Sequence, residues 1–214
     1  MKLVIGNKNY SSWSLRPWLA LKMAGIEFDE VRIPLDQPDT KSKILRYSPT
    51  GKVPCLIDGR LTVWDSLAIC EYVNETHAQG GLWPADRATR ATARAITAEM
   101  HSGFAALRTH LSMDIRARKP ARGAEAQRLA GVQADIERIV ALWTAALDAS
   151  GGPMLFGEFC IADAFYAPVV TRFVTYGVAL PPLLAAYSDR VLSLPPMQAW
   201  VAAAQAEVEE LTDH

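Results

Sequence analysis

The first third of the chain alternates short apolar runs with turn-forming residues. Apolar residues fill positions 3–5 and are followed by Gly6, a pattern typical of a short buried strand. Between positions 14 and 24 the apolar residues are spaced as on one face of a helix, which ends at Gly25. A second apolar alternation covers positions 31–35. This order predicts two parallel strands joined by a right-handed helical crossover.

A hairpin and another helix follow a polar connection. Residues 36–50 are polar and contain two prolines, so we expect a long connection with about one helical turn there. Two apolar runs, 55–57 and 61–64, flank Asp58-Gly59, a two-residue turn sequence of β-hairpins. Asp65-Ser66 then offers capping side chains for a helix that extends to about Glu75. The order β-α-β, linker, β-β-α is that of a thioredoxin-like domain.

The rest of the chain is helical in character. It is rich in Ala, Arg, Glu and Leu and shows no further strand pattern. The turn-rich stretch 80–84 predicts a linker between the two parts. We expect helices near residues 87–111, 124–149, 161–176, 182–187 and 196–210. The sequence therefore predicts an α/β plus all-α protein, with a thioredoxin-like N-terminal domain over residues 1–78 and a helical-bundle C-terminal domain over 87–214.

Composition narrows the classes of protein that fit this pattern. The 214 residues include 22 Lys and Arg against 23 Asp and Glu, which gives a net charge of −1. This balance argues against nucleic-acid binding through a basic surface and against a polybasic membrane anchor. Half of the residues are hydrophobic, but no window approaches the ~20 apolar residues of a membrane span. We therefore expect neither a nucleic acid nor a membrane as a partner.

Cysteine and histidine usage indicates a reducing setting without a metal. Cys55, Cys70 and Cys160 are widely separated among apolar neighbours, as buried reduced thiols are. The four His show no paired spacing of metal ligands, so no metal site is expected. The apolar run after the first two residues has only three members, whereas a secretory signal needs roughly 7–15. We expect a cytoplasmic protein.

Candidate chemistry begins with Tyr10-Ser11-Ser12-Trp13, which lies between the first strand and its helix. Ligands of parallel α/β units gather at the carboxyl ends of strands, beside helix N-termini whose N–H groups favour anions. A hydroxyl at this place can donate a hydrogen bond to a thiolate. Serine is also a common N-cap residue, so a purely capping role for Ser11 or Ser12 stays open.

Two further clusters each allow both a local structural interpretation and a ligand-binding one. In Gly51-Lys52-Val53-Pro54, a cis Val53–Pro54 bond would turn the backbone of Val53 toward an extended, peptide-like ligand. The pattern alone favours a trans bond, because only about 5–6% of X–Pro bonds are cis. Asp65-Ser66 is locally a capping pair, but it also places N–H groups and a hydroxyl where they fit a carboxylate.

Taken together, these motifs carry a family resemblance. The segments 11–16, 50–54 and 65–69 resemble the glutathione transferase family at matching spacings, and 157–163 resembles the capping box of its helical domain. Within the family the chain is most similar to serine-type, zeta-like enzymes and related bacterial members. Trp13 stands where those enzymes carry Cys, so the resemblance implies no redox cysteine at this site. Cys160 likewise replaces the usual Ser or Thr of the capping box, so we expect Asp163 to carry more of the capping.

The resemblance assigns roles to the candidate residues. It implies that Ser11, or else Ser12, activates the thiol of glutathione, with Tyr10 as a third candidate. The residues that it places around glutathione are Trp13, Lys41, Lys52, Val53, Pro54, Asp65 and Ser66. Val53 would pair with the cysteinyl part, Asp65 and Ser66 would hold the γ-glutamyl end, and Lys41 or Lys52 would meet the glycyl carboxylate.

The second substrate is expected in a cleft between the domains. Candidates to contact it are His101, Phe104 and His110, although a lone His is more often a surface or core residue. Arg172 is a weaker candidate for an acidic co-substrate, with a role on the helix surface preferred. Arg16 is expected to support the helix and the loop.

The function implied is a glutathione transferase that adds the thiolate to a small hydrophobic electrophile. The alternatives are a glutathione-dependent isomerase of the maleylacetoacetate or maleylpyruvate type, and a non-catalytic binding or regulatory module of the same fold. A homodimer is expected from the family, with Tyr72, Val73 and the helices near 87–111 as candidates for its apolar contact.

Overall fold

A computed structural model describes residues 1–211 of the chain. Its N-terminal part contains one four-stranded sheet with the strand order β2-β1-β3-β4. The strands are β1 (Lys2–Ile5), β2 (Asp29–Arg32), β3 (Cys55–Asp58) and β4 (Leu61–Trp64). β1 pairs in parallel with β2, while the β1–β3 and β3–β4 pairs are antiparallel. The predicted parallel crossover and hairpin are both present.

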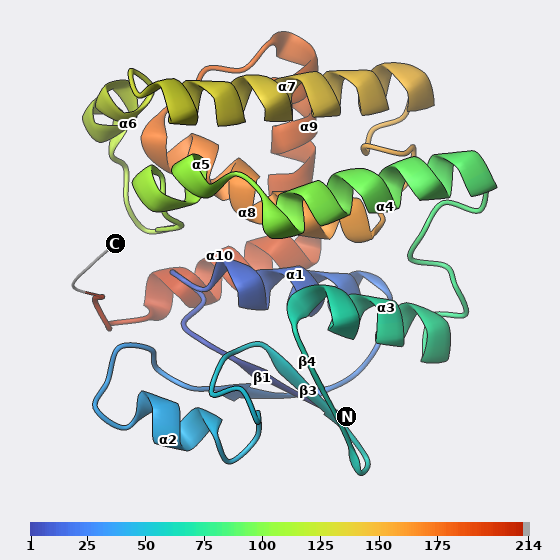
Figure 1. Cartoon of the computed structure of the whole chain (residues 1–214), viewed down its shortest axis with the longest axis vertical. Helices are drawn as coiled ribbons and strands as arrows, with labels where there is room; N and C mark the ends of the chain where they lie inside the picture. Colours follow the sequence, from blue (N-terminus) through green and yellow to red (C-terminus); the bar gives the residue numbers. More distant parts are fainter. Residues whose placement is uncertain (212–214) are drawn as a thin grey trace.

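Three helices flank this sheet. They are α1 (Ser12–Met23), α2 (Thr40–Ile44) and α3 (Ser66–Thr76). In Figure 1, α1 and α3 form a layer between the sheet and the later helices, whereas α2 lies away from that layer. Leu15 and Leu19 of α1 are fully buried in the same core as Leu3 and Ile5 of β1. The apolar face seen in the sequence thus packs against the sheet.

The remainder of the described chain is helical apart from two isolated bridges near residue 156. Its helices are α4 (Arg87–Ser102), α5 (Ala105–His110), α6 (Pro120–Ala126), α7 (Ala130–Ser150), α8 (Ile161–Tyr176), α9 (Pro182–Ser193) and α10 (Pro195–Ala206). α8 is central, because it packs against α1, α4, α6 and α9 and is buried along almost its whole length. The predicted fold class, α/β followed by all-α, is confirmed. No helix within residues 1–211 combines the length and the apolar character needed to cross a membrane.

The helix bounds differ from the expected ones in four places, one of which is the last helix, expected over 196–210 and observed as α10 over Pro195–Ala206. The helix expected over 87–111 is divided at Gly103-Phe104, because Phe104 has left-handed backbone angles with φ of 59°. The one expected over 124–149 is instead two helices, α6 and α7. The one expected over 182–187 extends to Ser193. The helix expected over 161–176 has these same bounds in the structure.

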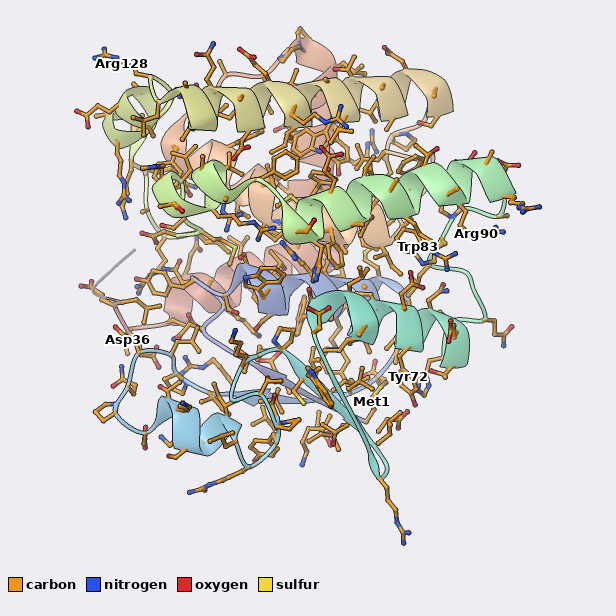
Figure 2. The ribbon with its side chains drawn as sticks, in the orientation of Figure 1. Met1, Asp36, Tyr72, Trp83, Arg90 and Arg128 are labelled. Carbon is orange, nitrogen blue, oxygen red and sulfur yellow. The ribbon has the colours of Figure 1, made fainter. Side chains whose placement is uncertain are left out.

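The two parts of the chain are joined by direct contacts. In the linker, Trp83 lies between α3 and α4 (Figure 2), and its indole N–H donates to Glu71 of α3 at 3.2 Å. Trp18 of α1 packs edge-on against Trp200 of α10, with ring centroids 5.0 Å apart. The indole N–H of Trp200 donates to the carbonyl of Lys8 at 3.0 Å. These contacts fix the helical part against the loop that precedes α1.

Candidate active site

A cleft of about 460 Å³ lies beside the N-terminus of α1. Both parts of the chain line it. From the N-terminal part come Tyr10, Ser11, Ser12, Trp13, Leu35, Thr40, Ile44, Gly51, Lys52 and Val53, and from the helical part Arg108, Ser112, Met113 and Arg172. The structure therefore brings together both candidate serines, Tyr10, and three of the seven residues expected around glutathione, namely Trp13, Lys52 and Val53. A larger hollow of about 1080 Å³ lies near the linker, between α4 and α7, and contains none of the predicted site residues.

The loop before α1 is held from two sides. Asn7 accepts the N–H of Ser11 at its carbonyl, 2.8 Å away, and the N–H of Leu35 at its side-chain oxygen, 2.7 Å away. Asn9 donates to Asp114 at 2.9 Å and accepts the N–H of Arg116 at 2.8 Å. Because both asparagines are fully buried, the loop that presents the serines is ordered by contacts with each domain.

Ser11 and Ser12 differ in their hydrogen-bond partners. Ser11 is the N-cap of α1, where its oxygen accepts the N–H of Ser14 at 3.4 Å and lies 2.7 Å from the Ser14 hydroxyl. The Ser12 oxygen instead accepts from Nη2 of Arg172, which reaches it from α8 at 3.2 Å. An oxygen that accepts from a guanidinium keeps its own proton for another acceptor. Ser12 can therefore donate into the cleft, and Ser11 can do so when the Ser14 hydroxyl donates to it.

Trp13 lies between two guanidinium groups at the edge of the cleft. Its ring is 37% exposed and has Arg16 at 4.1 Å and Arg108 at 4.8 Å from its centroid. Arg16 is fully buried and also stacks on Phe165 of α8 at 4.7 Å. Burial is the main cause that lowers the pKa of Arg16, and the neighbouring Arg108 and Arg172 add to it. The expected supporting role of Arg16 agrees with this packing.

The Val53–Pro54 bond is cis, which corrects the preference for trans that the local pattern gave. Val53 and Lys52 line the cleft, whereas Pro54 is buried behind them. The isomer of an ordered X–Pro bond is selected by its tertiary surroundings. The tetrapeptide alone does not contain that information.

Asp65 and Ser66 lie at the start of α3, outside the residues that line the cleft. Asp65 accepts the N–H groups of Leu67 and Ala68 at 2.8 and 3.3 Å, and has a φ of 75°. Its other oxygen meets Nε2 of His101, on α4, at 3.2 Å. The Ser66 hydroxyl is buried and has no hydrogen-bond partner within residues 1–211. A strained acidic cap beside a buried, unused hydroxyl is the kind of geometry found at ligand sites.

The remaining candidates occupy varied positions. Lys41 is exposed on α2 and does not line the cleft. Phe104 is buried, and His110 is exposed at the end of α5. Arg172 is only 4% exposed, so the preferred role on the helix surface is wrong. It lies on α8, a helix whose polar side chains are also buried.

Asp163 caps the N-terminus of α8, as expected. Its carboxylate accepts the N–H of Cys160 at 2.9 Å, the N–H of Leu155 at 3.2 Å and the hydroxyl of Tyr187 at 3.1 Å. Complete burial raises the pKa of Asp163 to about 6, although these hydrogen bonds oppose the shift. All three cysteines are buried and free.

Sequence reasoning missed Arg108, Ser112 and Met113, which line the cleft from the helical part. The candidates expected on the single helix over 87–111 were His101, Phe104 and His110, and Arg108 was not among them. In the structure the break at Gly103-Phe104 redirects the chain, and Arg108 folds back to donate to the carbonyls of Met100 and Gly103. Only a signal for that break would have placed Arg108 in the site.

Comparison with known proteins identifies the family to which this chain belongs. The family model for the N-terminal domain of glutathione S-transferases matches residues 10–76, and the model for the C-terminal domain matches residues 86–205. The chain belongs to the glutathione S-transferase family. The predicted family, with a glutathione transferase as its enzyme class and glutathione as the substrate or cofactor, is thereby confirmed.

Individual relatives include members named for the zeta class. A probable maleylacetoacetate isomerase from Caenorhabditis elegans is 30% identical over 171 residues, which are 80% of this chain and 78% of that protein. Glutathione S-transferase Z2 from Arabidopsis thaliana is 27% identical over 202 residues, covering 89% of this chain and 88% of the relative. The predicted similarity to zeta-like members agrees with both.

Solved structures share the fold over nearly the whole chain. A glutathione transferase homologue from Burkholderia gl BGR1 with bound glutathione has a TM-score of 0.72 and 28% identity, covering 96% of this chain and 98% of that one. A bacterial maleyl pyruvate isomerase of the zeta class has a TM-score of 0.75 at 24% identity, covering 98% and 100%. At 24% identity, the similarity to the maleyl pyruvate isomerase shows a shared fold alone.

Proposed function

We propose that this glutathione S-transferase binds glutathione in the cleft beside α1 and holds its thiol as a thiolate for addition to a small hydrophobic electrophile. The observation that carries the proposal is the contact of Arg172 with Ser12. The Ser12 oxygen accepts from a buried cation, and so its proton is available to the sulfur. Ser11, which also lines the cleft, is the second candidate, and Tyr10 is the third.

The Ser12 hydroxyl and the N-terminus of α1 together can supply the free energy needed to lower the pKa of the glutathione thiol. A thiol with a pKa of ~8.5 is only a few per cent ionised at pH 7, and lowering the pKa by about two units takes roughly 2.7 kcal/mol. A hydroxyl that donates to an anion contributes about 1.5–3 kcal/mol, and a helix N-terminus about 0.3–1 kcal/mol. The N-terminus of α1 and the Ser12 hydroxyl are both at the cleft. No general base is needed.

The remaining contacts with glutathione follow the resemblance. In this proposal the backbone of Val53, set by the bond to Pro54, pairs with the cysteinyl residue, and Lys52 or Lys41 meets the glycyl carboxylate. The γ-glutamyl end reaches Asp65 and Ser66, which is supported by the unpartnered hydroxyl of Ser66. Trp13 forms the side of the cleft where a Cys stands in zeta-like members.

We also propose the organisation and setting of the protein. The thioredoxin-like domain spans residues 1–78 and the helical domain 87–214, a division supported by the matched ranges 10–76 and 86–205. The protein acts as a homodimer in the cytoplasm. Exposed Leu61 and Trp64 on β4 support a dimer contact, whereas Val73, considered for it from the sequence, is buried in the core. Three free thiols support a reducing compartment.

The experiment is a steady-state assay of glutathione addition to a generic aryl halide. Ser12→Ala is expected to lower kcat/KM by about 10- to 100-fold, because one charge-assisted hydrogen bond is lost. Ser11→Ala should have the smaller effect. Ser193→Ala, at the end of α9 and outside the cleft, is the matched control. Turnover that is unchanged in both the Ser11 and Ser12 variants would remove serine activation from this proposal.

The two alternatives make different predictions. A non-catalytic module is favoured if the protein is not retained on immobilised glutathione and its melting temperature does not rise with glutathione. The isomerase alternative is compatible with the same thiolate site, and no contact in the cleft favours it over conjugation.

A further inference from the structure

The last turn of α4 and the first turn of α3 meet through a histidine and an aspartate. His101 is the penultimate residue of α4, and Asp65 is the N-cap of α3. Nε2 of His101 lies 3.2 Å from Oδ2 of Asp65, where the two helix ends lie close together in Figure 1. A residue of the helical part therefore contacts the acid that the proposed function places at the γ-glutamyl end of glutathione.

The two carboxylate oxygens of Asp65 have separate tasks. Oδ1 accepts the N–H groups of Leu67 and Ala68 and so caps α3. Oδ2 takes no part in the cap and faces His101. The Asp65 side chain is 43% exposed, so a ligand can reach it. Oδ2 is thus the oxygen that can attract a positively charged group of a ligand.

The ring of His101 is enclosed by other side chains. It packs edge-on against Trp13, with ring centroids 5.3 Å apart, and tilted against Phe165 of α8 at 6.0 Å. Its Nδ1 is buried and has no hydrogen-bond partner within residues 1–211. We therefore assign the proton of the neutral ring to Nε2, beside Asp65. A second proton, on Nδ1, would be a buried donor without an acceptor, which is unfavourable.

The charged groups around His101 also favour its neutral form. Burial is the main cause that lowers the pKa of His101, and the cations Arg16 of α1 and Arg108 of α5 add to it. Asp65, at the start of α3, opposes the shift. From α8 the ring meets the apolar Phe165. His101 is therefore uncharged at pH 7 and becomes a cation only at more acidic pH.

The charge of His101 determines whether Asp65 is available to a ligand. The γ-glutamyl end of glutathione carries an ammonium and a carboxylate, and Asp65 attracts the ammonium. A neutral His101 leaves the negative charge of Asp65 for that ammonium. A protonated His101 would form an ion pair with Asp65 and would place a second cation beside the ammonium, an arrangement that the like charges disfavour.

We propose that His101 is a positioning residue whose protonation controls the binding of glutathione: the neutral ring leaves Asp65 to the ammonium of the γ-glutamyl end, and the protonated ring withdraws Asp65 from it. This inference rests on the proposed function and adds the regulation of the same site. The two equilibria are reciprocal. Protonation of His101 weakens glutathione binding, and bound glutathione lowers the pKa of His101 by the equivalent amount.

The test measures the affinity for S-methylglutathione by calorimetry between pH 7.5 and pH 5. This ligand keeps the γ-glutamyl end but has no thiol, so ionisation of the sulfur does not contribute to the pH dependence. In the wild type, Kd should rise about threefold or more as the pH falls through the pKa of His101.

Two variants separate His101 from other titrating groups. His101→Gln is neutral at every pH, so its Kd should stay near the wild-type value at pH 7.5 and lose most of the rise at pH 5. His77→Gln is the matched control, because Nε2 of His77 lies 2.7 Å from Asp58 in a pair of the same kind at the other end of α3. Its pH dependence should equal that of the wild type.

Removing the ammonium from the ligand isolates the contact with Asp65. Glutaryl-S-methylcysteinylglycine differs from S-methylglutathione only in lacking the amino group. Its binding should not weaken as the pH falls, because the protonated His101 then has no ammonium to displace. Weakening by the same factor as for S-methylglutathione would overturn the role of the ammonium.

An NMR titration follows His101 itself. Saturating S-methylglutathione should lower the pKa of its imidazole by about half a unit or more, the equivalent of a threefold change in Kd, and should leave the pKa of His77 unchanged. An unchanged pKa of His101, or the same pH dependence of binding in the wild type and His101→Gln, would overturn this inference and leave the proposed function standing. Absence of binding at every pH would contradict both.

Discussion

At the residue scale, two adjacent serines at the start of α1 have different tasks because their oxygens have different partners. Ser11 caps the helix and shares a short contact with Ser14. Ser12 accepts from Arg172. The zeta-like signature favours Ser11, whereas the contact that distinguishes Ser12 comes from a residue 160 positions later in the chain. In the proposed function, this contact leaves the Ser12 proton for a bound sulfur.

A buried acid gives a prediction about pH. Asp163 has its pKa raised to about 6 by burial, against ~3.9 in an unfolded chain. The protonated group therefore favours folding below about pH 4, and this stabilisation is lost as the pH rises through about 6. Relative to Asp163→Asn, the wild type should lose about 3 kcal/mol of unfolding free energy between pH 4 and pH 7, on the order of 1.4 kcal/mol per pKa unit.

Urea unfolding at several pH values measures this difference. Asp148→Asn, at an exposed position on α7, is the control and should run parallel to the wild type. If the wild type and Asp163→Asn change together over the whole range, the Asp163 carboxyl has an ordinary pKa in the folded protein, and the hydrogen bonds from Cys160, Leu155 and Tyr187 outweigh its burial.

At the scale of elements, α8 organises both the core and the site. It contacts helices from both parts of the chain and carries Arg172, which lines the cleft, and Phe165, on which Arg16 stacks. The close approach of α6 to α8 depends on Gly123. A Cβ built there would lie 1.9 Å from the carbonyl oxygen of Tyr176, a distance no folded protein accommodates without a shift.

Gly123→Ala is therefore expected to destabilise the protein by about 1–3 kcal/mol, because overpacking forces the two helices apart. The result would oppose helix propensity, which favours Ala over Gly by about 1 kcal/mol. Thermal or urea unfolding gives the value. Gly131→Ala is the control, since a Cβ there would meet only the Cβ of Ala106, at 3.2 Å, and no backbone atom. Equal stability of Gly123→Ala and the wild type would contradict this packing.

Sequence pattern predicted elements well where one local signal determines them. The bounds of α8 follow from the capping residues Cys160 and Asp163 and the final Gly177, all local in the chain. The break at Gly103-Phe104 was missed because the apolar spacing continues across it. The cis bond at Pro54 and the burial of Arg172 were also missed, because each depends on contacts between distant segments. The serines and Val53 were expected from local motifs, and the structure places all three at one cleft.

At the scale of the whole molecule, the end of the chain binds the loop that carries the site. Glu207, just after α10, accepts the N–H groups of Lys8 and Asn9 at 2.7 and 3.0 Å. One of its carboxylate oxygens also lies 3.4 Å from a guanidinium nitrogen of Arg32, the last residue of β2. Arg116 donates to the backbone of Glu207 and Glu209 and to the hydroxyl of Tyr10. The two domains are thus connected directly behind the serines.

Glu207→Ala should leave two backbone N–H groups without an acceptor. We expect a loss of about 1–3 kcal/mol in unfolding free energy and faster hydrogen exchange at the amides of Lys8 and Asn9. Glu210→Ala, at an exposed position in the same segment, is the matched control. Unchanged exchange at both amides in Glu207→Ala would show that this contact does not order the loop.

The most direct test of the central claim is the ultraviolet titration of the glutathione thiolate bound to the enzyme. The account predicts that the thiol pKa falls by about two units below its free value of ~8.5 in the wild type and in the Ser193→Ala control, and that Ser12→Ala raises it by at least about one unit. A bound thiol that titrates as free glutathione does, or a pKa that is the same in Ser12→Ala as in the wild type, would contradict the account.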